Sequence, residues 1–62
     1  MRLKRYLVEY AEIVNGQIDF INMRGLTCHA KNPEEAKSRA REVGKRQYGE
    51  EPAILVVYVE VD

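Results

Sequence analysis

Little in this sequence can cross-link or anchor a very small protein. Its 62 residues include a single cysteine, Cys28, so no disulfide can form within the chain. Cys28 and His29 together cannot supply the four ligands of a structural zinc site. A domain of this length buries only about 60% of the surface that its unfolded chain exposes, and it usually needs an additional source of stability. By elimination, we expect that stability to come from association with another protein chain.

Long apolar segments are missing as well. The chain has no run of 18 apolar residues, which argues against a transmembrane helix. Its first ten residues carry charge where a signal peptide needs an apolar block. The single cysteine is consistent with a reducing compartment. We therefore expect one small domain over residues 1–62, located in the cytoplasm and without a membrane partner.

Signals of catalysis are equally scarce. The glycines do not have the spacing of a phosphate-binding loop. Cys28 and His29 are the one pair with catalytic chemistry, but neighbours in a strand point to opposite faces and cannot form a nucleophile–base dyad. Glu12 and Asp19 could face a divalent cation across a hairpin, yet two carboxylates alone are weak grounds for such a site. We expect no catalytic residue, no cofactor, no metal site and hence no enzyme.

A hairpin is the clearest structural signal in the sequence. Asn15-Gly16 separates two runs rich in β-branched and aromatic residues, 3–14 and 17–30, and this dipeptide suits a turn in which both residues have positive φ. A two-residue turn predicts the pairs Val14–Gln17, Tyr10–Ile21 and Val8–Met23. One face of the hairpin then carries a set of apolar residues: Tyr6, Val8, Tyr10, Ile21 and Met23.

Gly25 interrupts the second run and indicates a β-bulge. A bulge near this glycine changes which side chains share a face. We expect Leu26, Cys28 and Ala30 to join Met23 on the core face, with Thr27 and His29 on the other face.

A helix and a last strand follow the hairpin. Asn32 suits an N-cap, Pro33 the first helical position, and Glu35 the third position of a capping box. The helix is predicted from Pro33 to Gln47, with a narrow stripe of mostly small residues facing the sheet, namely Ala36, Ala40, Val43 and Gln47. The strand is predicted over 54–61.

The order of these elements predicts an α+β fold of ββαβ type. A right-handed crossover makes the second and third strands parallel. The expected sheet therefore has three strands in the order 2-1-3, antiparallel between neighbours, with one helix packed on one face.

The other face of this sheet is expected to be apolar. Leu55, Val57, Val59 and Val61 point to the core, so Ile54, Val56 and Tyr58 point to the back, joined by Leu7, Ala11, Ile13, Ile18 and Phe20. One helix cannot cover both faces, and exposed apolar patches generally mark interaction sites.

The third strand is also an uncharged edge, which invites pairing with another chain. We expect a homo-oligomer, most simply a dimer, whose interface contains Leu7, Phe20, Ile54, Val56 and Tyr58.

Charge is balanced overall but not along the chain. Ten Lys/Arg match ten Asp/Glu, yet the predicted helix is basic and the last residues are acidic. Lys37, Arg41 and Lys45 form one row on the helix and are the expected electrostatic contact with a macromolecular partner.

The alternative to a protein partner is nucleic-acid binding by this face of the helix, with Tyr6, Tyr10, Phe20 and Tyr58 stacking bases. Against it stand the lack of basic excess and the expected position of Tyr6 and Tyr10 under the helix.

The function predicted from these features is a small, non-enzymatic protein-binding module. It would act as an oligomeric regulator or inhibitor by steric docking on an unidentified protein partner. The hairpin, the Asn-Pro-Glu-Glu-Ala helix start and the terminal strand resemble many short accessory proteins of bacteria and their phages or other mobile elements. This resemblance is architectural and implies no site residue.

Overall fold

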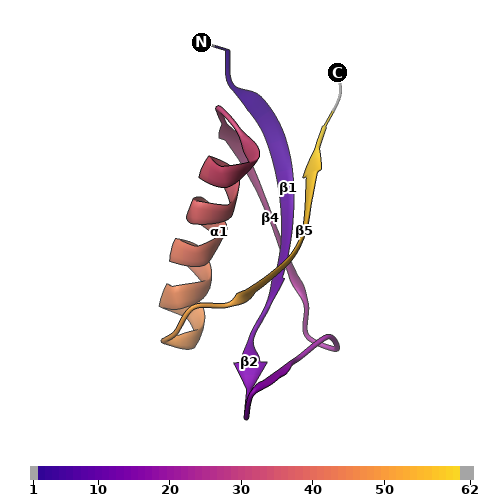
Figure 1. Cartoon of the computed structure of the whole chain (residues 1–62), viewed down its shortest axis with the longest axis vertical. Coiled ribbons are helices and arrows are strands. Elements are labelled where there is room, and N and C mark those ends of the chain that lie inside the picture. The colour runs from indigo at the N-terminus through magenta and orange to yellow at the C-terminus, as the bar shows by residue number, and fades with distance from the viewer. Residues whose placement is uncertain (1, 61–62) are drawn as a thin grey trace.

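The computed structural model describes residues 2–60 and places one helix against one face of a three-stranded antiparallel sheet (Figure 1). The sheet order is β4-β1-β5, with β1 in the centre and antiparallel to both neighbours. This confirms the predicted α+β class, the strand order and the single covered face. The elements in chain order are β1 (Lys4–Ala11), β2 (Ile13–Val14), β3 (Gln17–Ile18), β4 (Arg24–Ala30), α1 (Pro33–Tyr48) and β5 (Ala53–Val59). Over residues 2–60, no helix is both long enough and apolar enough to cross a membrane.

The Asn15-Gly16 turn forms as the sequence predicts. Asn15 has φ 51° and Gly16 has φ 76°, and Val14 pairs with Gln17 in a short ribbon of β2 and β3. The pairing then changes by three residues, because Tyr10 lies opposite Arg24 rather than Ile21. The predicted pairs Tyr10–Ile21 and Val8–Met23 are therefore wrong.

A turn between β3 and β4 takes up these extra residues. The Asn22 backbone N–H and side-chain amide donate hydrogen bonds to the Asp19 carboxylate over 3.3 and 3.0 Å. The break in the hairpin thus lies at residues 19–23 and not at Gly25. As a result Ile21 and Met23 are exposed, in contrast to their predicted place in the core.

The core lies between β1 and α1. Tyr6, Val8 and Tyr10 project from β1 and are buried against Ala36 and Ala40 of the helix. Leu26, Cys28 and Ala30 pack on the same cluster, as predicted, while Thr27 and His29 are exposed.

The helix begins where the sequence predicts. The Asn32 Oδ1 accepts a hydrogen bond of 2.8 Å from the Glu35 backbone N–H, which confirms the N-cap. The Glu35 carboxylate pairs with Arg39 at 3.2 Å instead of completing a capping box. The helix continues to Tyr48, one residue beyond the predicted end, and stops at Gly49, whose φ of 82° suits glycine.

Loss of this cap gives a first testable expectation. Asn32→Ala leaves the Glu35 N–H without its partner, so we expect the free energy of unfolding to fall by about 1 kcal/mol. Asn32→Asp keeps an acceptor at the same place and serves as the control. Urea unfolding followed by circular dichroism measures both, and equal losses for the two variants would contradict the capping role.

β5 has a different register from the one expected. Val59 and Val57 lie opposite Tyr6 and Val8, but Tyr10 lies opposite Ile54, so Leu55 is an extra residue at a bulge. The bulge turns Ile54 towards the core, where it packs beside Val57. The prediction that Val57 faces the core is confirmed. Leu55, the extra residue at the bulge, and Val59, which is exposed, do not pack against the core cluster as predicted. Val61 lies outside the described residues.

Candidate functional site

The face of the sheet away from α1 carries a small group of apolar side chains. Leu7 lies at its centre, between Tyr58 on β5 and Thr27 on β4. Leu7 is half-buried, whereas the Val56 and Tyr58 side chains are 38% and 49% exposed. We call these three apolar residues, Leu7, Val56 and Tyr58, the sheet back. They are the members of the predicted interface that the structure brings together.

The other two predicted interface residues lie elsewhere. Ile54 packs against the core because of the bulge at Leu55, so its assignment to the sheet back is wrong. Phe20 lies in the turn after β3 and not on the three-stranded sheet. Ala11, also expected on this face, is fully buried opposite Ala53. The sheet back is therefore smaller than the sequence suggests.

The outer edge of β5 adjoins the sheet back. In the described residues, β5 has β1 as its one strand neighbour. The Glu60 N–H donates a hydrogen bond of 2.8 Å to the Arg5 carbonyl, so Arg5 and Glu60 form a hydrogen-bonded pair. Antiparallel strands alternate hydrogen-bonded and non-hydrogen-bonded pairs, and Val59 and Val57 therefore belong to non-hydrogen-bonded pairs with Tyr6 and Val8. It follows that the backbone groups of Val57 and Val59 point outward, away from β1. A second strand could pair with them.

A second exposed apolar region was not anticipated from the sequence. Residues 12–23 form a projection, here called the hairpin arm, that extends past the C-terminal end of α1 (Figure 1). Phe20 and Ile21 at its turn are 63% and 93% exposed. The large apolar side chains exposed on the arm are Ile13, Val14, Ile18, Phe20, Ile21 and Met23. The signal that could have revealed it is Asp19 three residues before Asn22, a turn pattern inside a strand-like run.

The arm also carries negative charge. The Asp19 N–H donates to the Glu12 carbonyl over 2.9 Å, so these two acidic residues lie opposite each other, as predicted. The side-chain hydrogen bond from Asn22 holds the pKa of Asp19 below its usual value. Neither carboxylate forms an ion pair with a residue in the range 2–60.

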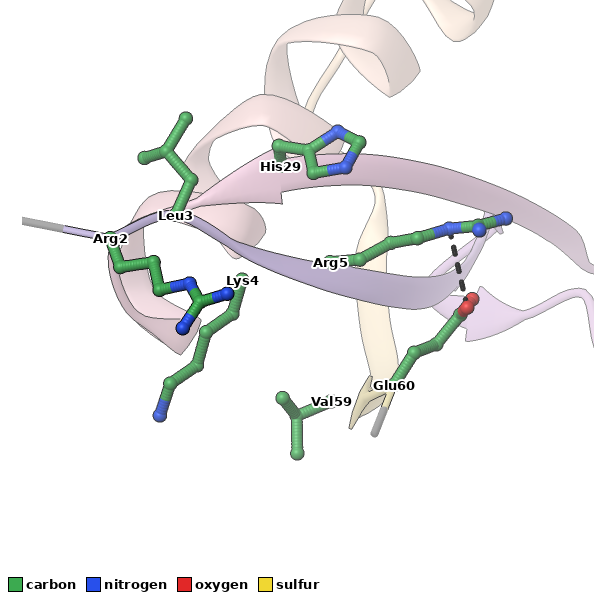
Figure 2. A pocket seen from close by; sticks show the side chains of 7 residues that line it. All are labelled: Arg2, Leu3, Lys4, Arg5, His29, Val59 and Glu60. Carbon is green, nitrogen blue, oxygen red and sulfur yellow. Dashed lines mark ion pairs between the residues drawn. The ribbon is translucent and has the colours of Figure 1, made fainter. Parts of the chain in front are cut away.

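The opposite end of the molecule is hollow and basic. An open hollow of about 660 Å³ is bordered by the N-terminal residues, β4 and β5. Figure 2 shows the side chains that line it. Arg5 forms an ion pair of 3.2 Å with Glu60, while Arg2 and Lys4 form none within residues 2–60. We call this region the basic hollow. It is lined by Arg2, Leu3, Lys4, Arg5, His29, Val59 and Glu60.

The basic row on the helix is partly neutralised. Lys37 pairs with Glu34 at 3.3 Å, whereas Arg41 and Lys45 border a shallow depression that also contains Glu42 and Glu51. Of the aromatic residues considered for base stacking, Tyr6 and Tyr10 are buried beneath the helix. Phe20 and Tyr58 are exposed but belong to different surfaces.

Cys28 and His29 do not form a reactive pair. The Cys28 side chain is half-buried against the core cluster, and His29 is exposed on the opposite face of β4. Residues 2–60 contain no cluster of three or more potential metal ligands.

The surfaces that the geometry offers are thus the sheet back with the β5 edge, the hairpin arm and the basic hollow. Comparison of the chain with protein-family models, with curated proteins and with solved structures gives no match.

Proposed function

We propose that this protein is a non-enzymatic binding module that associates with a second copy of itself through the sheet back and the edge of β5. The observation that carries the proposal is that Val56 and Tyr58 are exposed beside outward-pointing backbone groups of the same strand. An edge with these properties is suited to pairing with another chain. The charged end of the strand, at Glu60, limits this surface on one side.

The small core supports the same proposal. Within residues 2–60, four of the seven buried hydrophobic residues are alanine, which leaves Tyr6, Val8 and Tyr10 as the larger buried side chains. Burial contributes roughly in proportion to apolar area, so such a core stabilises a chain of this length only weakly. Pairing at the β5 edge would bury further apolar surface of Val56 and Tyr58 and add to the stability.

The dimer would act in the cytoplasm as a regulator or inhibitor that binds a macromolecule and blocks it sterically. The cationic side chains of half-buried Arg41 and exposed Lys45 are the electrostatic contact we assign to that partner, with Lys37 contributing less because it pairs with Glu34. Regulators of this kind need a rigid surface and no reactive group.

Tyr58→Lys tests the proposed association. A lysine here puts charge beside the same residue of the second copy, so we expect the mass measured by light scattering to fall from that of a dimer towards that of one chain. Val56→Lys is expected to have the same effect. A wild-type protein with the mass of one chain at micromolar concentration would overturn the proposal.

Thr27→Lys is the matched control. Thr27 is exposed on the same face but lies on β4, at the far edge of the sheet. Edge pairing through β5 predicts that Thr27→Lys stays dimeric. If Thr27→Lys dissociates as readily as Tyr58→Lys, the two copies pack face to face and the β5 edge is not the contact.

A further inference from the structure

The two ends of the molecule complement each other in charge. The hairpin arm projects at one end of the long axis, opposite the end where the chain termini lie (Figure 1). The basic hollow is lined by residues near those termini, among them Arg2, Lys4 and Glu60. The molecule measures 40 × 18 × 14 Å along its principal axes, so the arm cannot reach the hollow of its own chain. We propose that the hairpin arm of one copy docks in the basic hollow of a second copy, so that copies join head to tail.

The arm has the features of an inserted element. Phe20 and Ile21 project from a turn that two hydrogen bonds to the Asp19 carboxylate hold in place. A turn already ordered in this way loses little conformational entropy on binding. Adjacent exposed apolar side chains in the turn between β3 and β4, at the side of the arm, are unfavourable in water and favour contact with a partner.

The hollow has the complementary features. Its volume of about 660 Å³ is open to solvent and large enough to admit side chains of a partner. Val59 offers a half-exposed apolar side chain, and Arg2 and Lys4 extend on the same side of β1 as Val59 (Figure 2). Their positive charges complement Glu12 and Asp19, the carboxylates on the arm that have no ion-pair partner in residues 2–60.

A second copy of the chain is the occupant that these observations favour. Each molecule carries both halves of the contact, and the two halves have opposite charge within a sequence whose net charge is zero. When the arm of one copy occupies the hollow of another, the pair still has one free arm and one free hollow. Association therefore continues into open chains of copies unless it closes into a ring. This contact shares Val59 with the proposed β5 edge, but it uses neither Val56 nor Tyr58 and can form without the proposed dimer.

The test uses two variants that each destroy one half of the contact. Ile21→Lys places positive charge in the arm's turn between β3 and β4, and Arg2→Glu with Lys4→Glu reverses the charge of the hollow. Both are made together with Tyr58→Lys, which removes association through the sheet back. All these positions are exposed, so the fold, checked by circular dichroism, is expected to be retained.

In sedimentation velocity, the Tyr58→Lys protein should grow in mass with concentration, and added salt should reduce this growth. Ile21→Lys and the Arg2→Glu/Lys4→Glu variant should each weaken association by more than about tenfold, because like charges then meet. An equimolar mixture of the two should form a complex of two chains and nothing larger, since one functional arm meets one functional hollow. Arg46→Glu, a charge reversal on the exposed helix surface, should leave association unchanged.

Three results would overturn the inference: a Tyr58→Lys protein that stays at the mass of one chain up to millimolar concentration, variants of arm and hollow that assemble as before, or a mixture that forms no complex. The second and third results do not bear on the sheet back. Loss of association on Tyr58→Lys alone would support the dimer proposed above and reject the head-to-tail contact.

Discussion

Tyr10→Ala is expected to remove most or all of the stability of this protein. Tyr10 is 2% exposed in the centre of the core, its hydroxyl donates a hydrogen bond of 2.8 Å to the Gln47 Oε1, and its ring lies 6.2 Å from the Tyr48 ring. Truncating a large buried aromatic side chain costs about 3–5 kcal/mol. A chain of this length has a total of roughly 3–9 kcal/mol, from about 0.05–0.15 kcal/mol per residue.

Urea unfolding followed by far-ultraviolet circular dichroism measures the effect. Tyr10→Phe keeps the ring and loses the hydroxyl, so we expect a fall of about 1 kcal/mol in the free energy of unfolding. Tyr58→Phe, at a half-exposed position, should change the stability of the isolated chain little. If Tyr10→Ala proved as stable as Tyr10→Phe, the ring would not hold the helix on the sheet as the structure indicates.

Gly44→Ala is expected to destabilise the protein although alanine is the better helix former. A Cβ atom built on Gly44 would lie 2.9 Å from both the Cβ and the Cδ atoms of Pro52, closer than side-chain carbons approach. Overpacking costs about 1–3 kcal/mol, or more where the backbone must move. Since the gain in helix propensity is at most about 1 kcal/mol, we expect a net loss of about 2 kcal/mol.

Pro52→Ala provides the matched test of this contact. Removing the proline ring makes room for the new methyl group, so the double variant should lose less stability than the two single variants added together. Ser38→Ala, on the exposed side of the helix, is the control for helix propensity and should change stability by a few tenths of a kcal/mol. A Gly44→Ala protein more stable than the wild type would show that Pro52 does not limit the approach of the helix.

The errors in the sequence prediction have two local causes. The turn formed by Asp19 and Asn22 shifts the hairpin by three residues, and the bulge at Leu55 reverses the faces of the residues before it. Strand side chains alternate with a period of two, so a single extra residue moves every side chain beyond it to the other face. This is why Val56 and Tyr58 were placed correctly while Ile54 was not.

The candidate surfaces could be predicted only in part for the same reason. The half-exposed face of the sheet follows from alternation within β1 and β5, which needs no knowledge of the turn. The hairpin arm exposes Ile21 and Met23, which alternation alone would place in the core. The basic hollow depends on which ends of β1, β4 and β5 lie together, and no local sequence pattern predicts how these strand ends are arranged.

The sequence by itself determined the local structure and the fold class. Asn15-Gly16 permits the positive φ angles of the turn, Asn32 supplies the hydrogen-bond acceptor that begins the helix, and the order of the elements leaves one right-handed arrangement of three strands. Tertiary structure alone decided the register, the bulge and the projection of the arm. These depend on how Tyr10 and Ile54 fit beneath the helix, and packing of this kind arises between residues that are distant in the chain.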